Sequence, residues 1–103
     1  MLFISYYELS EEGNVAERLQ AAQKIMAKGL YPPKGVNVLR WDVTPDGWGI
    51  VVAETDSVAA LNDAIGVWRA ASPGFFKMIK TSPAMPVQEA IPSSVALLQA
   101  LGS

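Results

Sequence analysis

The chain has 103 residues, of which 50% are hydrophobic and 17% charged, and its formal net charge is −2. This length suits a single domain with a modest core, and the composition is that of a globular rather than a disordered chain. The net charge is weakly negative, and no local cluster of Lys or Arg offers a positive surface to phosphate groups. We therefore expect no nucleic-acid partner.

The sequence contains neither Cys nor His. Disulfides, thiolate nucleophiles and the commonest metal and haem ligands are therefore excluded, and we expect no metal and no cofactor. The apolar opening, residues 1–5, has no basic segment before it and Glu8 soon interrupts it, so we interpret it as a strand rather than a signal peptide. Every apolar run is far shorter than a membrane span. We expect a soluble, cytoplasmic protein with no membrane partner.

The first half of the chain predicts a strand, a helix and a hairpin. Leu2–Tyr7 is rich in bulky and aromatic residues and predicts a first strand, and Ser10–Asn14 offers capping groups for a helix. Gly29 is expected to end that helix. Val36–Thr44 and Trp48–Thr55 predict two strands joined by the turn residues Pro45, Asp46 and Gly47. The helical spacing of apolar residues that defines the first helix comprises Val15, Leu19, Ala22, Ile25 and Met26.

The second half predicts another helix and a fourth strand. Asp56 or Ser57 is expected to cap the helix, which ends before Ser72. Phe75–Thr81 predicts the fourth strand, where Lys77 and Lys80 are typical of an edge strand. The apolar stripe of the second helix comprises Val58, Leu61, Ile65 and Trp68.

The element order β-α-β-β-α-β predicts an α+β, ferredoxin-like fold, with an antiparallel sheet and two helices on one of its faces. We expect this domain to occupy residues 1–90. Residues 91–103 form a C-terminal tail, in which Pro92-Ser93-Ser94 is expected to start a short helix over Val95–Leu101.

Both faces of the predicted sheet carry apolar side chains. One face goes under the helices, and the other would leave an exposed apolar patch. We expect a homodimer that pairs the two open faces, and the alternative is that the C-terminal tail folds back over this face. Strand alternation predicts the following sets: Leu39, Trp41 and Val43 opposite Val36, Val38, Arg40 and Asp42; Trp48, Ile50 and Val52 opposite Val51 and Ala53; Leu2, Ile4 and Tyr6 opposite Phe3 and Tyr7; Phe75 and Ile79 opposite Phe76 and Met78.

Short motifs make the chain resemble a known family. They are Met1-Leu2-Phe3, Pro32-Pro33-Lys34-Gly35, Asp46-Gly47 with Gly49, Val52-Ala53-Glu54-Thr55-Asp56-Ser57, Trp68, and Pro86-Val87-Gln88-Glu89-Ala90. Together they resemble the small bacterial proteins called domain of unknown function 3303. The resemblance implies a dimeric α/β barrel, and it implies no activity. Transfer of the oxygenase, haem-degrading or isomerase activities of other dimeric α/β barrels would be analogy at the level of fold.

Charged residues of the hairpin are the candidates for proton transfer. Arg40, Asp42 and Glu54 share a strand phase that can bring them to one face. With Tyr7 as a hydroxyl donor, Asp42 and Glu54 are the weak catalytic candidates. The structural alternative, which we favour, is an Arg–carboxylate pair across the strands or at the dimer interface.

Aromatic residues are the candidates for ligand binding. Trp41, Trp48 and Tyr6, with Arg40, are the residues that we predict to bind a flat apolar ligand, whereas Trp68 continues a helix stripe and belongs to the core. Three functions stay open. They are a small homodimeric binding or accessory protein that holds an apolar or aromatic metabolite, a cofactor-free monooxygenase or isomerase acting on an aromatic or polyketide-like substrate, and a purely structural dimer with a packed barrel.

Overall fold

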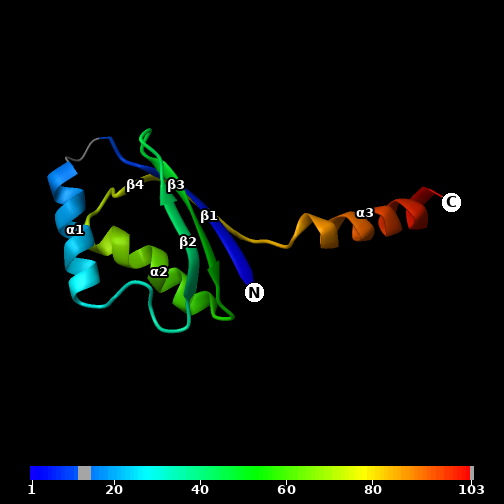
Figure 1. Ribbon diagram of the computed structural model, residues 1–103, viewed down its shortest axis with the longest axis horizontal. Helices are drawn as coiled ribbons and strands as arrows, with labels where there is room; N and C mark the ends of the chain where they lie inside the picture. The colour runs from blue at the N-terminus through cyan, green and yellow to red at the C-terminus, as the bar shows by residue number, and fades with distance from the viewer. Residues whose placement is uncertain (12–14, 103) are drawn as a thin grey trace.

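The computed structural model describes residues 1–11 and 15–102. Its elements are β1 (Leu2–Leu9), α1 (Val15–Ala27), β2 (Asn37–Val43), β3 (Trp48–Glu54), α2 (Val58–Ala71), β4 (Phe76–Pro83) and α3 (Val87–Gly102). The strands form one antiparallel sheet in the order β2-β3-β1-β4, so the ferredoxin-like fold is confirmed and β4 is an edge strand. Both α1 and α2 lie on one side of the sheet, and α3 extends away on the other side (Figure 1).

Local sequence signals set the boundaries of these elements as predicted. Gly29 has a φ of +64° after α1, where the N–H of Leu30 donates to the carbonyl of Ile25 at 3.1 Å. Gly47 has a φ of +78° in the hairpin turn. The Ser57 hydroxyl oxygen caps α2 by accepting from the N–H of Ala60 at 3.1 Å. The cap predicted for α1 falls partly on residues 12–14, which lie outside the described residues.

The pairing register decides which side chains face the helices. Tyr7 lies opposite Gly49 and Phe3 opposite Ala53, and these pairs face α1 and α2, where Phe3, Tyr7 and Ala53 are buried. The alternate positions face away from the helices and form what we call the open face. It comprises the apolar residues Leu2, Ile4, Tyr6, Trp48, Ile50, Val52 and Met78, together with Glu8, Arg40, Asp42, Glu54, Lys80 and Ser82. The prediction that the sheet is apolar on both faces is thus confirmed for β1 and β3.

Two register shifts change which side chains of the edge strands β2 and β4 face the helices. The pairing of β2 with β3 shifts between Val38 and Arg40, so Val38 faces the helices, as does Trp41. The pairing of β4 with β1 similarly skips Lys77, which turns Phe76 toward the core. The predictions that Val36 and Val38 share a face with Arg40, and Phe76 with Met78, were therefore wrong, because one extra residue reverses the alternation.

The helices bury less of their predicted stripes than expected. In α1 the buried residues are Ala21 and Ile25, while Val15 and Leu19 are 61% and 56% exposed. In α2 Trp68 is buried as predicted, but Val58 is 76% exposed. The physical reason is that α1 packs against α2 rather than flat on the sheet (Figure 1). Val15, Arg18 and Leu19 of its first turns consequently line a cavity.

The C-terminal helix is longer than predicted. It begins at Val87 rather than Val95, and Pro92 lies inside it. The backbone N–H groups of Glu89 and Ala90 donate to the Pro86 carbonyl, which closes the first turn before Pro92 is reached. Pro92 removes one hydrogen-bond donor but lies on an exposed helix, where water can satisfy the freed carbonyl. Pro92 therefore does not mark the start of the helix, and α3 crosses residue 90, where we placed the domain boundary.

Candidate ligand-binding cavity

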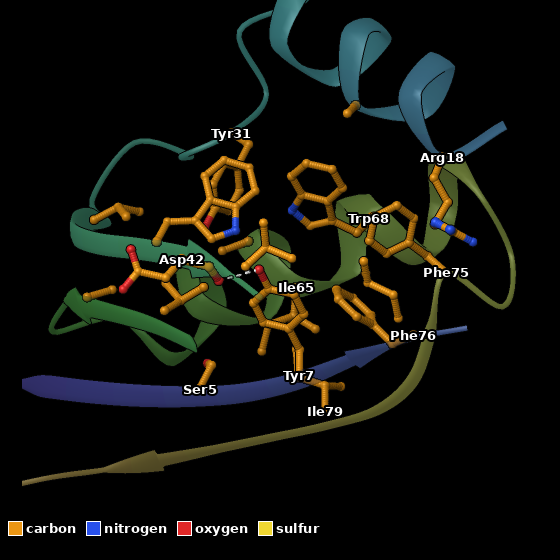
Figure 2. A pocket seen from close by; sticks show the side chains of 18 of the residues that line it. Ser5, Tyr7, Arg18, Tyr31, Asp42, Ile65, Trp68, Phe75, Phe76 and Ile79 are labelled. Atoms are coloured by element: carbon orange, nitrogen blue, oxygen red, sulfur yellow. Dashed lines mark hydrogen bonds between the residues drawn. The ribbon is translucent and has the colours of Figure 1, made fainter. Parts of the chain in front are cut away.

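A cavity of about 370 Å³ lies between the helix-facing side of the sheet and the helices α1 and α2. Cavities of this size hold small organic molecules in other proteins. All four strands contribute, because the side chains that face the helices form its floor. The lining comprises Phe3, Ser5, Tyr7, Leu9, Val15, Arg18, Leu19, Ala22, Tyr31, Val36, Val38, Trp41, Asp42, Val43, Val51, Ala53, Leu61, Ala64, Ile65, Trp68, Phe75, Phe76 and Ile79. The set is dominated by apolar and aromatic side chains, several of which point toward one another in Figure 2.

Aromatic rings form the most distinctive wall of this cavity. The Trp68 ring centroid lies 5.3 Å from that of Tyr31 and 5.6 Å from that of Trp41, at interplanar angles of 73° and 66°. Phe75 contacts Trp68 from another side, with 5.2 Å between centroids. Edge-to-face pairs of this kind stabilise one another beyond their burial. They also fix the rings, so a flat ligand can stack on one ring and meet the edge of the next.

Tyr7 places a hydroxyl group in the cavity. Its side chain starts from β1 opposite Gly49, and the hydroxyl donates to the backbone carbonyl of Asp42 at 2.7 Å (Figure 2). Burial raises the pKa of Tyr7, the Trp41 side chain acts in the opposite direction, and the carboxylate of Asp42 raises the pKa further. The phenol therefore keeps its proton at neutral pH. It is a fixed hydrogen-bonding group and not a base.

Other polar groups in the lining are few. The Ser5 hydroxyl is bonded to that of Thr81 at 2.7 Å, so this pair is already satisfied. Arg18 comes from α1 and donates from its guanidinium group to the carbonyl of Ser10 at 2.8 Å. Among the described residues of the lining it is the only basic one, and it places positive charge beside Phe75 (Figure 2).

The predicted catalytic residues are divided between the two faces of the sheet. Tyr7 lies in the cavity lining, whereas Glu54 is exposed on the open face. Asp42 gives its backbone carbonyl to Tyr7, but its carboxylate forms an ion pair with Arg40. Arg40, Asp42 and Glu54 do share one face. The Arg40–Asp42 pair forms along β2 rather than across strands.

The predicted ligand-binding residues are divided in the same way. Trp41 lies in the cavity lining, but Trp48, Tyr6 and Arg40 lie on the open face. There the Tyr6 ring is 5.9 Å from that of Trp48, and its hydroxyl donates to Glu8 at 3.1 Å. A ligand-binding role for these three residues stays a prediction, and it concerns the open face rather than the cavity.

Sequence reasoning missed Tyr31 and Arg18. Tyr31 is buried in the aromatic wall, but it precedes two prolines in a connecting segment, where no periodicity indicates a buried side. Arg18 lies outside the apolar stripe predicted for the first helix, so helical spacing gives no reason to place it in a cavity. The one available signal was that Tyr31 is a large aromatic residue.

A family model described as domain of unknown function (DUF3303) matches residues 1–98. The chain belongs to this family. No curated protein matches the DUF3303 chain. Among solved structures it is similar to an antibiotic biosynthesis monooxygenase, at 18% identity and a TM-score of 0.48, over 84% of this chain and 100% of the other. It is also similar to an uncharacterized NIPSNAP-like domain protein from Burkholderia xenovorans, at 10% identity and a TM-score of 0.49, over 82% of this chain and 90% of the other.

In the part of the chain that the structure describes, no three acidic side chains come together in a way that could hold a metal ion. None of the helices within residues 1–11 and 15–102 has the length and hydrophobicity needed to cross a membrane.

Proposed function

We propose that this chain is a homodimeric binding protein and that each protomer holds a small, flat, apolar or aromatic molecule in the cavity. The observation that carries the proposal is the cavity of about 370 Å³ with aromatic walls, into which β1 places the buried hydroxyl of Tyr7. Burial of an aromatic ligand against Trp41, Tyr31 and Trp68 supplies the affinity, and the Tyr7 hydroxyl fixes the orientation.

The hydrogen bond of Tyr7 favours a particular ligand chemistry. Its proton is engaged with the Asp42 carbonyl at 2.7 Å, so the phenolic oxygen presents lone pairs to the cavity. A ligand O–H or N–H can donate to this oxygen without breaking the existing bond. A ligand carbonyl would have to displace Asp42, so we propose a phenol, an alcohol or an amine on the ligand ring.

A binding role is favoured over a catalytic one by the position of the acidic groups. The carboxylates of Asp42 and Glu54 belong to the open face, and Tyr7 keeps its proton. A proton-transfer reaction in the cavity would therefore lack a base among the residues predicted to supply it. The same residues fit an ion pair and a polar margin on the open face.

The open face supports the homodimer in this proposal. Ile4, Trp48 and Met78 are 44%, 39% and 40% exposed there, next to the partly exposed Ile50 and Val52. Pairing two such faces around a two-fold axis covers them with a self-complementary surface. Light scattering at micromolar concentration should give the mass of a dimer, and a monodisperse monomer would contradict this part of the proposal.

Ligand binding is tested by native mass spectrometry and by titration. Protein purified from its source should carry a small molecule, and the purified chain should bind the aromatic probe 8-anilinonaphthalene-1-sulfonate with quenching of Trp fluorescence. Tyr7→Phe should weaken binding of phenolic ring compounds about 5–10-fold, as expected for one lost hydrogen bond.

Tyr6→Phe is the matched control, because Tyr6 lies next to Tyr7 but faces away from the cavity. It should leave binding unchanged. Absence of saturable binding, or an equal loss in both variants, would overturn the proposed ligand site.

A further inference from the structure

The helix α3 has an apolar side that nothing in its own protomer covers. Val87, Ile91, Val95, Leu98 and Leu101 recur at helical spacing along one side, and they are 66%, 56%, 47%, 71% and 83% exposed. Glu89 is the only charged residue of the helix. Most of the stability of a helix in a protein comes from packing of its apolar side, so α3 needs a surface that covers this stripe.

The connection to β4 directs α3 away from its own sheet. The N–H of Ala84 donates to the carbonyl of Leu2 at 2.9 Å, which holds the chain beside the start of β1. Pro83 and Pro86 limit the turning of the linker between the two elements. The molecule consequently measures 59 Å along its longest axis, and α3 projects on the side of the sheet opposite to α1 and α2 (Figure 1).

The uncovered apolar area of α3 and the open face together matches the area that a stable interface with a second copy of this chain would bury. With ~100 Å² of removable apolar area per large side chain, the five residues of the stripe offer roughly 500 Å² and the open face about as much again. A standard stable interface buries about 800 Å² on each partner. Either surface alone therefore falls short, and the two together reach the required area.

The length of α3 is also close to the length of a strand in the sheet. At ~1.5 Å per residue its 16 residues span roughly 24 Å, and the 8 residues of β1 span about 27 Å. An arm of this length can therefore lie along a full strand of the second copy.

We propose that α3 is an exchanged arm: in the dimer, the α3 of each protomer packs its apolar stripe against the second copy. This inference rests on the homodimer of the proposed function. It adds to that homodimer an interaction surface that lies outside the paired sheets.

The dimer dissociation constant tests the arm. Leu98→Glu places a charge in the stripe and should raise this constant at least 10-fold in sedimentation equilibrium. Ser93→Glu, on the other side of the same helix, is the matched control and should change it less than twofold. If wild-type protein dimerises and Leu98→Glu leaves its dissociation constant unchanged, the arm is refuted while the dimer stands. A monomeric wild type refutes both, and binding of the aromatic probe still tests the cavity separately.

A photo-crosslinker decides which copy the arm contacts. A benzophenone amino acid in place of Leu98 reacts with whatever surface covers this position. The expected product has the mass of a dimer, with crosslinked peptides between the arm of one copy and the body of the other. A crosslink within a single chain would show that the arm folds back onto its own sheet, and no crosslink would show that it is uncovered. Either result overturns the proposal.

Discussion

Gly49 is the position where one added methyl group should perturb both the sheet and the cavity. It lies opposite Tyr7 in the pairing of β1 with β3. A Cβ at this position would overlap the Asp42 carbonyl oxygen and the Tyr7 hydroxyl, and it would come within 2.6 Å of the Cζ atom of Tyr7. These are the two groups joined by the 2.7 Å hydrogen bond. Gly49→Ala must therefore move the backbone of β2 or expel the Tyr7 ring.

The magnitude follows from these contacts. Overpacking of this kind costs about 1–3 kcal/mol, and loss of the hydrogen bond of Tyr7 about 1 kcal/mol. We expect the free energy of unfolding of Gly49→Ala to fall by roughly 2–4 kcal/mol, measured by urea denaturation with Trp fluorescence as the signal. Tyr7→Phe removes the hydrogen bond without the overlap and should cost only about 1 kcal/mol.

The comparison of the two variants gives the decisive result. If Gly49→Ala is as stable as Tyr7→Phe, or more stable, the close approach of Tyr7 to the β3 backbone is not present in solution. The aromatic probe should also bind Gly49→Ala more weakly, because the displaced Tyr7 ring enters the cavity or leaves its wall.

Three other variants or conditions test separate features. Gly66→Ala fills open space inside α2 and should stabilise the protein by up to about 1 kcal/mol in the same denaturation assay, whereas a loss would show that a neighbour occupies this space. Burial raises the pKa of Tyr7 and of Tyr31 above 10.0. As the pH rises past this value, the unfolded chain releases these protons first, so the free energy of unfolding should fall, and Tyr7→Phe should make the fall shallower. A slope that Tyr7→Phe leaves unchanged would contradict the burial of this phenol. The Arg40–Asp42 pair is exposed, with 68% and 44% of the two side chains accessible, so Arg40→Gln should change stability little and even less at high salt. A large loss in urea denaturation would place this pair in a buried interface.

Much of the fold could be predicted because its signals are local. The hairpin turn at Gly47, the cap at Ser57 and the end of α1 at Gly29 each depend on a few neighbouring residues, and each is confirmed. The alternation in β1 and β3 was also readable, because these central strands pair without an internal shift over most of their length.

The candidate site was harder to predict because it depends on irregularities that leave no local pattern. A single extra residue near Leu39 brings Val38 to the same face as Trp41, and another at Lys77 turns Phe76 inward. Tyr31 comes from a connecting segment, where burial is decided by Trp41 and other residues distant in sequence. The cavity arises from the way α1 packs on α2, a tertiary feature that helical periodicity cannot express.

Successive residues of a β-strand face opposite sides of the sheet, so ligand binding in the cavity and dimerisation through the open face depend on neighbouring residues of β3. The two properties can therefore be tested independently. Val51 lines the cavity, whereas Val52 belongs to the open face. Val51→Phe should fill the cavity and abolish binding of the aromatic probe while the protein stays a dimer. Val52→Lys should raise the dimer dissociation constant at least 10-fold, because an unpaired charge is placed in an apolar interface, and should leave probe binding by the protomer intact. Light scattering and fluorescence titration on the same samples measure both properties. If Val52→Lys loses probe binding and dimerisation together, the site needs both protomers, and a cavity confined to one face of the sheet is the wrong description.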